Sequence, residues 1–112
     1  DALRRRCLYH YVDYPDPDRE ARIIMAHLSG IGASLSLQIA RMVEAIRKED
    51  LRKVPGVAET LDWAAALVGV DLRDLHDNPE AVHQTLLCLL KTREDRSRVS
   101  REVTERLLGR VA

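Results

Sequence analysis

The side chains best suited to chemistry are three adjacent arginines near the start of the chain. Arg4, Arg5 and Arg6 stand together, and guanidinium groups suit phosphate because their planar donors match its oxygens. Such a cluster could stabilise a phosphoryl group during transfer, or bind the phosphates of DNA or RNA. It could equally be the solvated basic end of a helix, where the helix dipole favours cations.

The histidines and cysteines show no spacing typical of a metal ligand set or of a nucleophile with its base. The histidines are His10, His27, His76 and His83. No two of them are four residues apart, and a strand carrying Cys7 and His10 would point them apart. Cys88 lies in a leucine run and resembles a small core residue. We predict no metal site, no disulfide framework, and a reducing, cytoplasmic setting.

Composition indicates one small helical domain. The 112 residues are 46% hydrophobic and 32% charged, with no Phe and one Trp, so the core must be aliphatic, which favours helices. Eighteen basic residues balance eighteen acidic ones, so no long-range field draws the domain to nucleic acid or to an anionic membrane. No apolar run approaches the roughly 20 residues that span a bilayer. We expect neither partner.

The first element expected is a short strand over residues 8–14, which alternates, is rich in aromatic and β-branched residues, and closes at Pro15. An isolated strand has no ladder partner, so its sheet would belong to a longer polypeptide. Asp16 and Pro17 then predict a helix start, and the apolar period continues to about residue 28.

Further helices follow the apolar periodicity. Ser34 is predicted to cap the second helix, which fades near residue 47, and the break at Pro55 and Gly56 precedes a third helix that ends near Gly69. The apolar face predicted for the third helix is Val57, Leu61, Ala64, Ala65 and Val68. Trp63 lies off that face, so it would cap the edge of the core, or pack against the missing core domain or a partner.

The fourth helix should open at Asn78 and Pro79 and carry a broad apolar face over 82–90, which predicts that it is central. The charged run 91–98 would continue or bend it before a last helix over 99–108. The fold class expected is all-α: a bundle of four to five helices preceded by a strand remnant.

Four segments resemble, in family order, the C-terminal region of MoxR-like AAA+ ATPases. Residues 1–8, which read Asp1, Ala2, Leu3, two arginines, Arg6, Cys7 and Leu8, resemble the stretch after sensor 1 that ends in a core arginine. Residues 11–20 resemble the crossing from core to lid. Residues 55–64 resemble the lid helix that carries sensor 2, and residues 89–95 the close of the lid. The likeness extends to about residue 96.

This resemblance implies a domain division and a function. Residues 1–14 would end the AAA+ core, and residues 15–112 would form the lid over ATP and Mg²⁺ bound to the missing core domain. Arg6 would be the finger that reaches the γ-phosphate of a neighbouring subunit in a ring, expected to be hexameric. Arg4 and Arg5 are the adjacent alternatives for this role. The whole protein would couple hydrolysis to chaperone-like maturation of other enzymes or insertion of their cofactors, with a von Willebrand factor A partner.

One departure concerns sensor 2, because alignment through Trp63 places Ala58 or Glu59 where relatives carry the nucleotide-sensing arginine. Arg52 and Lys53 in the preceding loop are the candidate substitutes for contact with the nucleotide. The Walker A loop and the acidic Walker B end are not in these residues, so the chain alone is not expected to be an enzyme. The alternative is a free-standing helical protein-interaction module without nucleotide binding.

Overall fold

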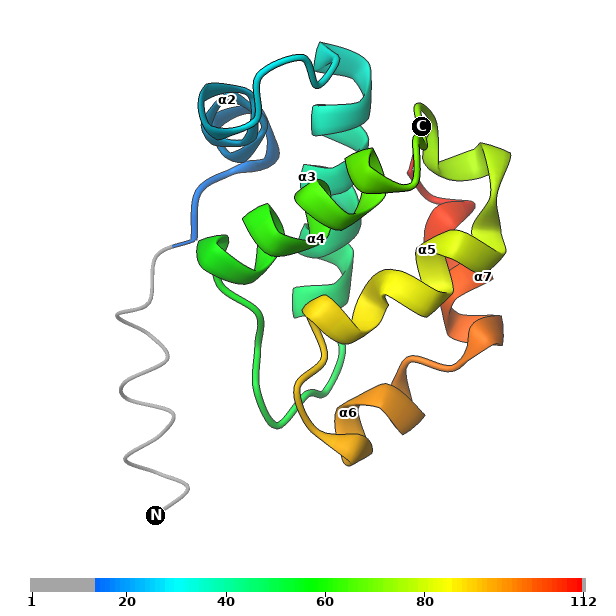
Figure 1. Ribbon diagram of the computed structural model, residues 1–112. Helices are drawn as coiled ribbons and strands as arrows, with labels where there is room; N and C mark the ends of the chain where they lie inside the picture. Colours follow the sequence, from blue (N-terminus) through cyan, green and yellow to red (C-terminus); the bar gives the residue numbers. More distant parts are fainter. Residues whose placement is uncertain (1–13, 112) are drawn as a thin grey trace.

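Residues 14–111 are described by a computed structural model, and they form helices joined by short loops (Figure 1), with no strand in that range. The elements in chain order are α2 (Pro17–His27), α3 (Ala33–Arg47), α4 (Val57–Gly69), η1 (Leu75–Asp77), α5 (Pro79–Thr85), η2 (Leu86–Cys88), α6 (Arg93–Arg98) and α7 (Arg101–Leu108). The predicted all-α class is confirmed. The expected strand lies outside the described residues, except for Tyr14.

Side-chain caps set most of the helix starts. Asp16 accepts a hydrogen bond from the Arg19 backbone N–H at 2.8 Å, and Asn78 accepts one from Ala81 at 3.1 Å. Both caps precede a proline at the first helical position, as the sequence predicts. These local signals explain why α2 and α5 begin where expected.

The predicted cap at Ser34 is wrong, because α3 already begins at Ala33 and its N-cap is Gly32. Gly30 turns the chain with a φ of 91°, a conformation that glycine adopts without strain. No side chain caps α3; the Ser36 hydroxyl instead donates to the Gly32 carbonyl at 2.9 Å. The glycine-rich turn therefore replaces a capping side chain.

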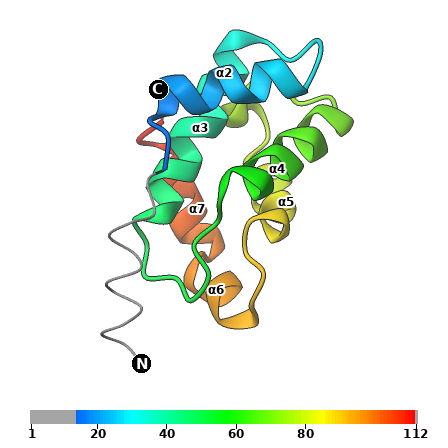
Figure 2. The same ribbon diagram turned by 90° about the vertical axis from the view of Figure 1, so that its left-hand side faces the viewer.

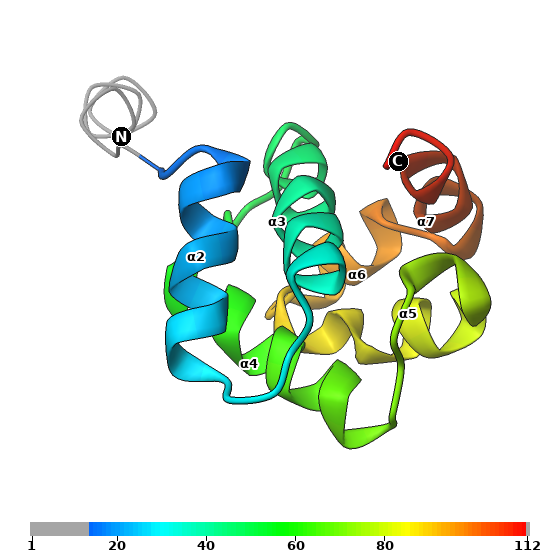
Figure 3. The ribbon, with the colours of Figure 1, turned by 90° about the horizontal axis from the view of Figure 1, so that it is seen from above.

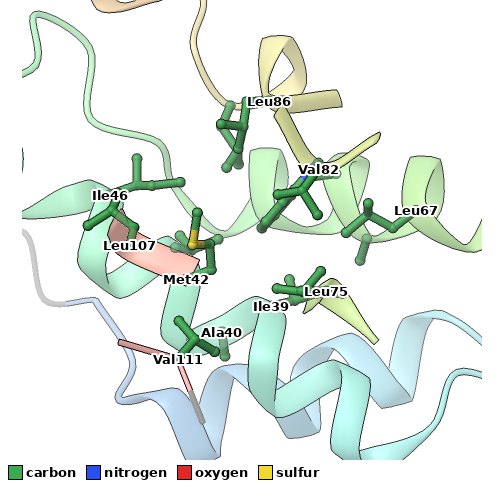
Figure 4. Packing of buried hydrophobic residues seen from close by; sticks show 14 of the residues in the cluster. Ile39, Ala40, Met42, Ile46, Leu67, Leu75, Val82, Leu86, Leu107 and Val111 are labelled. Atoms are coloured by element: carbon green, nitrogen blue, oxygen red, sulfur yellow. The ribbon is translucent and has the colours of Figure 1, made fainter. Parts of the chain in front are cut away.

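The central helix is α3, and the prediction that the fourth helix is central is wrong. Seen from above, α3 lies between α2 and α7 (Figure 3), and it also contacts α4. Ile39, Met42 and Ile46 on α3 are fully buried and face core residues from α4, α5 and α7 (Figure 4). The fourth helix has only seven residues before it tightens into η2, which turns Leu87 out to solvent.

The buried face of α4 is rotated from the predicted one. The residues that α4 buries are Thr60, Trp63, Ala64 and Leu67. Trp63 is fully buried, so its placement at the core edge is also wrong. Its indole N–H donates to Thr85 Oγ1 on α5 at 2.8 Å, and a buried Trp needs such a partner.

The charged run after Lys91 neither continues nor bends the fourth helix. Thr92 accepts from the Asp95 N–H and starts a separate helix, α6, and Ser100 starts α7 in the same way. Val99, Leu107 and Leu108 from this tail are buried in the core. Among residues 14–111, no helix is long and apolar enough to cross a membrane.

Leu86 and Leu87 are adjacent leucines in opposite environments, with exposed fractions of 2% and 58%. Leu86→Ala should lower the free energy of unfolding by roughly 2 to 5 kcal/mol, because it leaves a cavity in the core. Leu87→Ala is the matched control and should cost under about 0.5 kcal/mol. Urea titration measures both, and equal midpoints for the two variants would contradict the core assignment. Sequence periodicity predicts that Leu61 also belongs to the core, but its side chain is only half-buried. Leu61→Ala should therefore lower the free energy of unfolding by less than Leu86→Ala does.

Candidate functional site

The predicted site residues fall into two groups. Arg6 lies outside the described residues, as do Arg4 and Arg5. Arg52 and Lys53 both lie on the loop 48–56 between α3 and α4, and both are exposed. That loop is therefore the part of the predicted site that the structure describes.

A buried carboxylate fixes the backbone of this loop. Asp95 on α6 is fully buried, and its two oxygens accept hydrogen bonds from the backbone N–H groups of Arg52 at 2.7 Å and Lys53 at 2.9 Å. Hydrogen bonds to a charged acceptor are the stronger kind. Asp95 thus fixes the loop backbone at Arg52 and Lys53, while both of these side chains are exposed.

The two basic side chains differ in their partners. Arg52 Nη1 lies 3.7 Å from Glu94 Oε1 in an exposed pair. Lys53 forms no ion pair with any residue in the range 14–111. Of these two predicted residues, Lys53 is consequently the more available cation, and the paired Arg52 is the weaker candidate.

At its other end the loop is held by Arg47, the last residue of α3. The Arg47 side chain is 7% exposed, and its two terminal nitrogens donate to the two carboxylate oxygens of Glu20, each at 2.8 Å. The Glu20 side chain is 1% exposed. Arg47 Nε donates to the Pro55 carbonyl at 2.9 Å. One guanidinium thus joins α2, α3 and the loop.

Two further contacts extend this group to α4 and to the start of the described chain. Arg47 Nη2 lies 3.4 Å from Thr60 Oγ1, and its guanidinium carbon lies 4.3 Å from the centre of the Tyr14 ring. That distance is typical of a cation–π contact. Figure 2 shows the described residues just before α2 and the loop after α3 on the same side of the bundle.

The position expected for sensor 2 has another use here. Glu59 Oε1 accepts a hydrogen bond from the Gly56 backbone N–H at 2.8 Å, which satisfies a donor at the start of α4. Ala58 is exposed. At the start of α4, therefore, an acid stabilises the helix where the resemblance expects a nucleotide-sensing arginine.

The described histidines serve as hydrogen-bond partners. His83 Nδ1 lies 2.8 Å from Thr104 Oγ1, and His27 Nδ1 lies 3.0 Å from the Ile23 carbonyl. His76 Nε2 donates to the Leu108 carbonyl at 2.9 Å, and its Nδ1 lies 3.0 Å from Asp74 Oδ1. Over residues 14–111, no three His, Cys, Asp or Glu side chains are grouped so as to hold a metal ion.

Sequence reasoning missed Glu20, Arg47 and Asp95, the three charged groups that organise the site. A signal was present, since Glu20 precedes the buried Ile24 by four residues and Arg47 follows the buried Val43 by four. Each charge therefore continues an apolar helix face. Glu20 and Asp95 also fall within the segments that carry the family resemblance.

Comparison with known proteins gave no match to a protein family, to a curated protein or to a solved structure.

Removing the charge of Glu20 tests how much the buried ion pair of Glu20 and Arg47 contributes to stability. Glu20→Gln leaves Arg47 buried without its counter-charge and should lower the free energy of unfolding by roughly 3 to 5 kcal/mol. Glu80→Gln is the control, because the Glu80–Arg101 pair is exposed and should contribute about 1 kcal/mol or less. Urea titration compares them, and a Glu20 variant no less stable than the Glu80 variant would contradict a central role for the pair.

His76 should make stability depend on pH. Acceptance of its proton by the Leu108 carbonyl, together with the Asp74 carboxylate, raises the pKa of His76 above its ordinary 6.5. A raised pKa in the folded state gives stability that is fully present below pH 6.5 and is lost as the pH rises through the folded value.

The measurement is the free energy of unfolding against pH for the parent chain and for His76→Gln. The parent should lose stability from pH 6.5 upward relative to the variant, which cannot titrate there. The other histidines are common to both chains and cancel in the difference. Parallel curves would show that His76 does not couple to folding.

Proposed function

We propose that this chain is the C-terminal lid region of a MoxR-like AAA+ ATPase, with residues 1–14 closing the core and residues 15–112 forming the lid. The observation that carries the proposal is the convergence on Arg47 of two segments that resemble the family. Tyr14 and Glu20 come from the segment 11–20, and Thr60 comes from the segment 55–64. A third such segment supplies Asp95, which holds the loop.

This convergence suits the mechanical task of a lid. A lid must move as one body and must be joined firmly to the core by the crossing segment. The buried pair of Glu20 and Arg47 ties the helix after that crossing to α3, and Pro55 and Thr60 extend the tie to α4. Motion at the crossing therefore reaches three helices at once.

The same side of the bundle offers a cation for the nucleotide. ATP bound to the core would supply the phosphoryl group, with Mg²⁺ neutralising its charge. In this proposal Lys53, on a loop whose backbone is fixed by Asp95, contacts the phosphates, with Arg52 beside it. The chain alone is not an enzyme in this proposal; it acts within a cytoplasmic ring, expected to be hexameric, that matures other enzymes and has a von Willebrand factor A partner.

The alternative is a free-standing helical interaction module. Its best support is the exposure of Val68, Val70 and Leu87, the large apolar side chains most open to solvent in the described range. Val68 lies at the end of α4, Val70 is the residue that follows this helix, and Leu87 lies in η2. Isolated exposed apolar residues are normal on protein surfaces. We prefer the lid, because it accounts for the order of the four segments and for the contacts that side chains of three of them make within the described residues.

Arg6 should act on the neighbouring subunit in the intact assembly. Arg6→Ala should lower ATP turnover by about three decades, since arginine fingers contribute roughly 10³ to 10⁵. Nucleotide binding should survive, because the finger acts mainly in the transition state. Steady-state ATPase assays and nucleotide titration of the full-length assembly measure the two effects.

A mixing experiment is the control. Subunits that carry Arg6→Ala and an intact Walker A loop should regain activity beside subunits that lack a working Walker A loop but keep Arg6, because each supplies what the other lacks. Turnover by the Arg6→Ala assembly at the parent rate would show that Arg6 is only a helix-end charge, and Arg4 or Arg5 would then be tested in its place. An assembly with no ATPase activity in its parent form would overturn the lid proposal itself.

A further inference from the structure

We propose that the groove between α5, η2 and α6 is a docking site for a segment of a partner protein in which acidic residues flank one large apolar side chain. The groove has a volume of about 220 Å³, and Leu87 is among the residues that line it. The proposal concerns this surface alone and does not rest on the proposed function.

The inner surface of the groove is apolar. Leu86, Leu90 and Val99 line it, and all three are otherwise buried, with exposed fractions of 2% or less. Leu87 also lines the groove but is 58% exposed. It therefore differs from an isolated surface leucine, because an entering apolar group would contact Leu87 and the buried side chains together.

The size of the groove favours a single side chain over a small-molecule ligand. Sites for drug-sized molecules usually measure roughly 300 to 1,000 Å³ and enclose most of the ligand. A cavity of roughly 150 Å³ already holds a benzene-sized group. The groove of about 220 Å³ therefore suits one leucine, methionine or phenylalanine side chain, presented by a larger partner whose backbone stays outside.

The charge at the groove is positive. Arg96 on α6 lines it, and its Nε donates to the Leu90 carbonyl at 2.9 Å, which holds the guanidinium beside the apolar surface. The two terminal nitrogens of Arg96 form no hydrogen bond or ion pair with any residue in the range 14–111. A carboxylate next to the apolar anchor could accept from both of them, which is the geometry that guanidinium and carboxylate groups favour.

The chain itself supplies no such carboxylate. Among the described residues, no acidic side chain lines the groove. Asp95 and Glu94 both interact with the loop between α3 and α4, and Glu80 pairs with Arg101 at 2.7 Å. Arg96 is therefore left to an acid from outside, and a basic partner would be repelled.

The polar side chains that line the groove are already held in place. His83 Nδ1 lies 2.8 Å from Thr104 Oγ1, and Gln84 Nε2 donates to Glu80 Oε2 at 3.1 Å. Arg96 is held by its bond to a backbone carbonyl. A preformed site loses less conformational entropy on binding, so that even a short segment can bind measurably.

A second cleft in the structure provides an internal reference. It lies at the start of α3, and an exposed apolar side chain, Val68, lines it too. Asp71 and Arg73 both line that cleft, so its charges favour neither sign of partner. An acidic segment should therefore distinguish the two surfaces.

The first test titrates the isotope-labelled chain with the peptide Gly-Ser-Glu-Leu-Glu-Ser-Gly, blocked at both ends, and follows amide chemical shifts. The shifts should be largest at Leu87, Arg96 and Val99, with a dissociation constant on the order of 1 mM, as expected for one anchor side chain. Replacing the leucine of the peptide by alanine, or its two glutamates by lysine, should weaken binding at least about tenfold. The Gly32 and Arg73 amides at the second cleft should not shift.

The second test changes the chain instead of the peptide. Leu87→Ala shortens the exposed leucine and Arg96→Gln removes the charge, and each should weaken binding of the parent peptide about tenfold. Arg73→Gln is the matched control, because it removes the same charge from the second cleft and should bind like the parent. Leu87→Ala should fold normally because that side chain is exposed. If Arg96→Gln did not fold, the lysine peptide would still test the charge.

Several results would overturn the proposal. It would be wrong if the peptide shifted no groove amide at several millimolar, or if it shifted the amides of both clefts alike. Equal binding of the alanine or lysine peptide would show that the anchor or the acids are not recognised. Equal weakening by Arg96→Gln and Arg73→Gln would show that only net charge matters. None of these results depends on ATPase activity, so failure here and failure of the proposed function are separate outcomes.

Discussion

The buried pair of Arg47 and Glu20 is the interaction on which the arrangement of the first three described helices depends. Apolar burial holds α2, α3 and α4 together but is not directional, so by itself it leaves helices free to slide or rotate. Removing two charges from water is costly, and the cost is met only by close geometry and by extra partners. Here the close geometry is the pair of 2.8 Å hydrogen bonds between Arg47 and Glu20. The extra partners of Arg47 are the Pro55 carbonyl and the Tyr14 ring. The pair therefore selects one packing of these helices among several that would bury similar apolar area.

The polar side chains within the family-like segments have mainly structural roles in this fold. Glu59 stabilises the start of α4, Thr92 caps α6, and Asp95 holds the loop. Each satisfies backbone donors that would otherwise lack partners. A resemblance that rests on such residues therefore bears on the fold, and it does not by itself identify groups that act on a nucleotide. At the position where the resemblance implies sensor 2, the side chain present is an acid with a structural role.

Local signals were enough to predict where several elements begin, but not which faces they bury. Asp16 with Pro17, and Pro55 with Gly56, act within a few residues and correctly placed the starts of α2 and α4. Trp63 was misplaced because its burial depends on Thr85, 22 residues away, and the Glu20–Arg47 pair spans 27 residues. The loop position of Arg52 and Lys53 followed from composition. The sequence did not predict that Arg52 has an ion-pair partner while Lys53 has none among the described residues. That partner is Glu94 on α6, and periodicity does not separate α6 from the preceding helix.

The packing of the tail has a consequence for biosynthesis. Leu107, Leu108 and Val111 are buried, and α7 contacts α3, which lies more than fifty residues earlier in the chain. During synthesis the N-terminal helices leave the ribosome first, yet one apolar side of α3 stays uncovered until α7 has followed. The bundle cannot reach its final packing as each helix appears; packing is completed only after α7 has been synthesised. In the interval, the exposed side of α3 is the surface on which a chaperone would act, or from which aggregation would start.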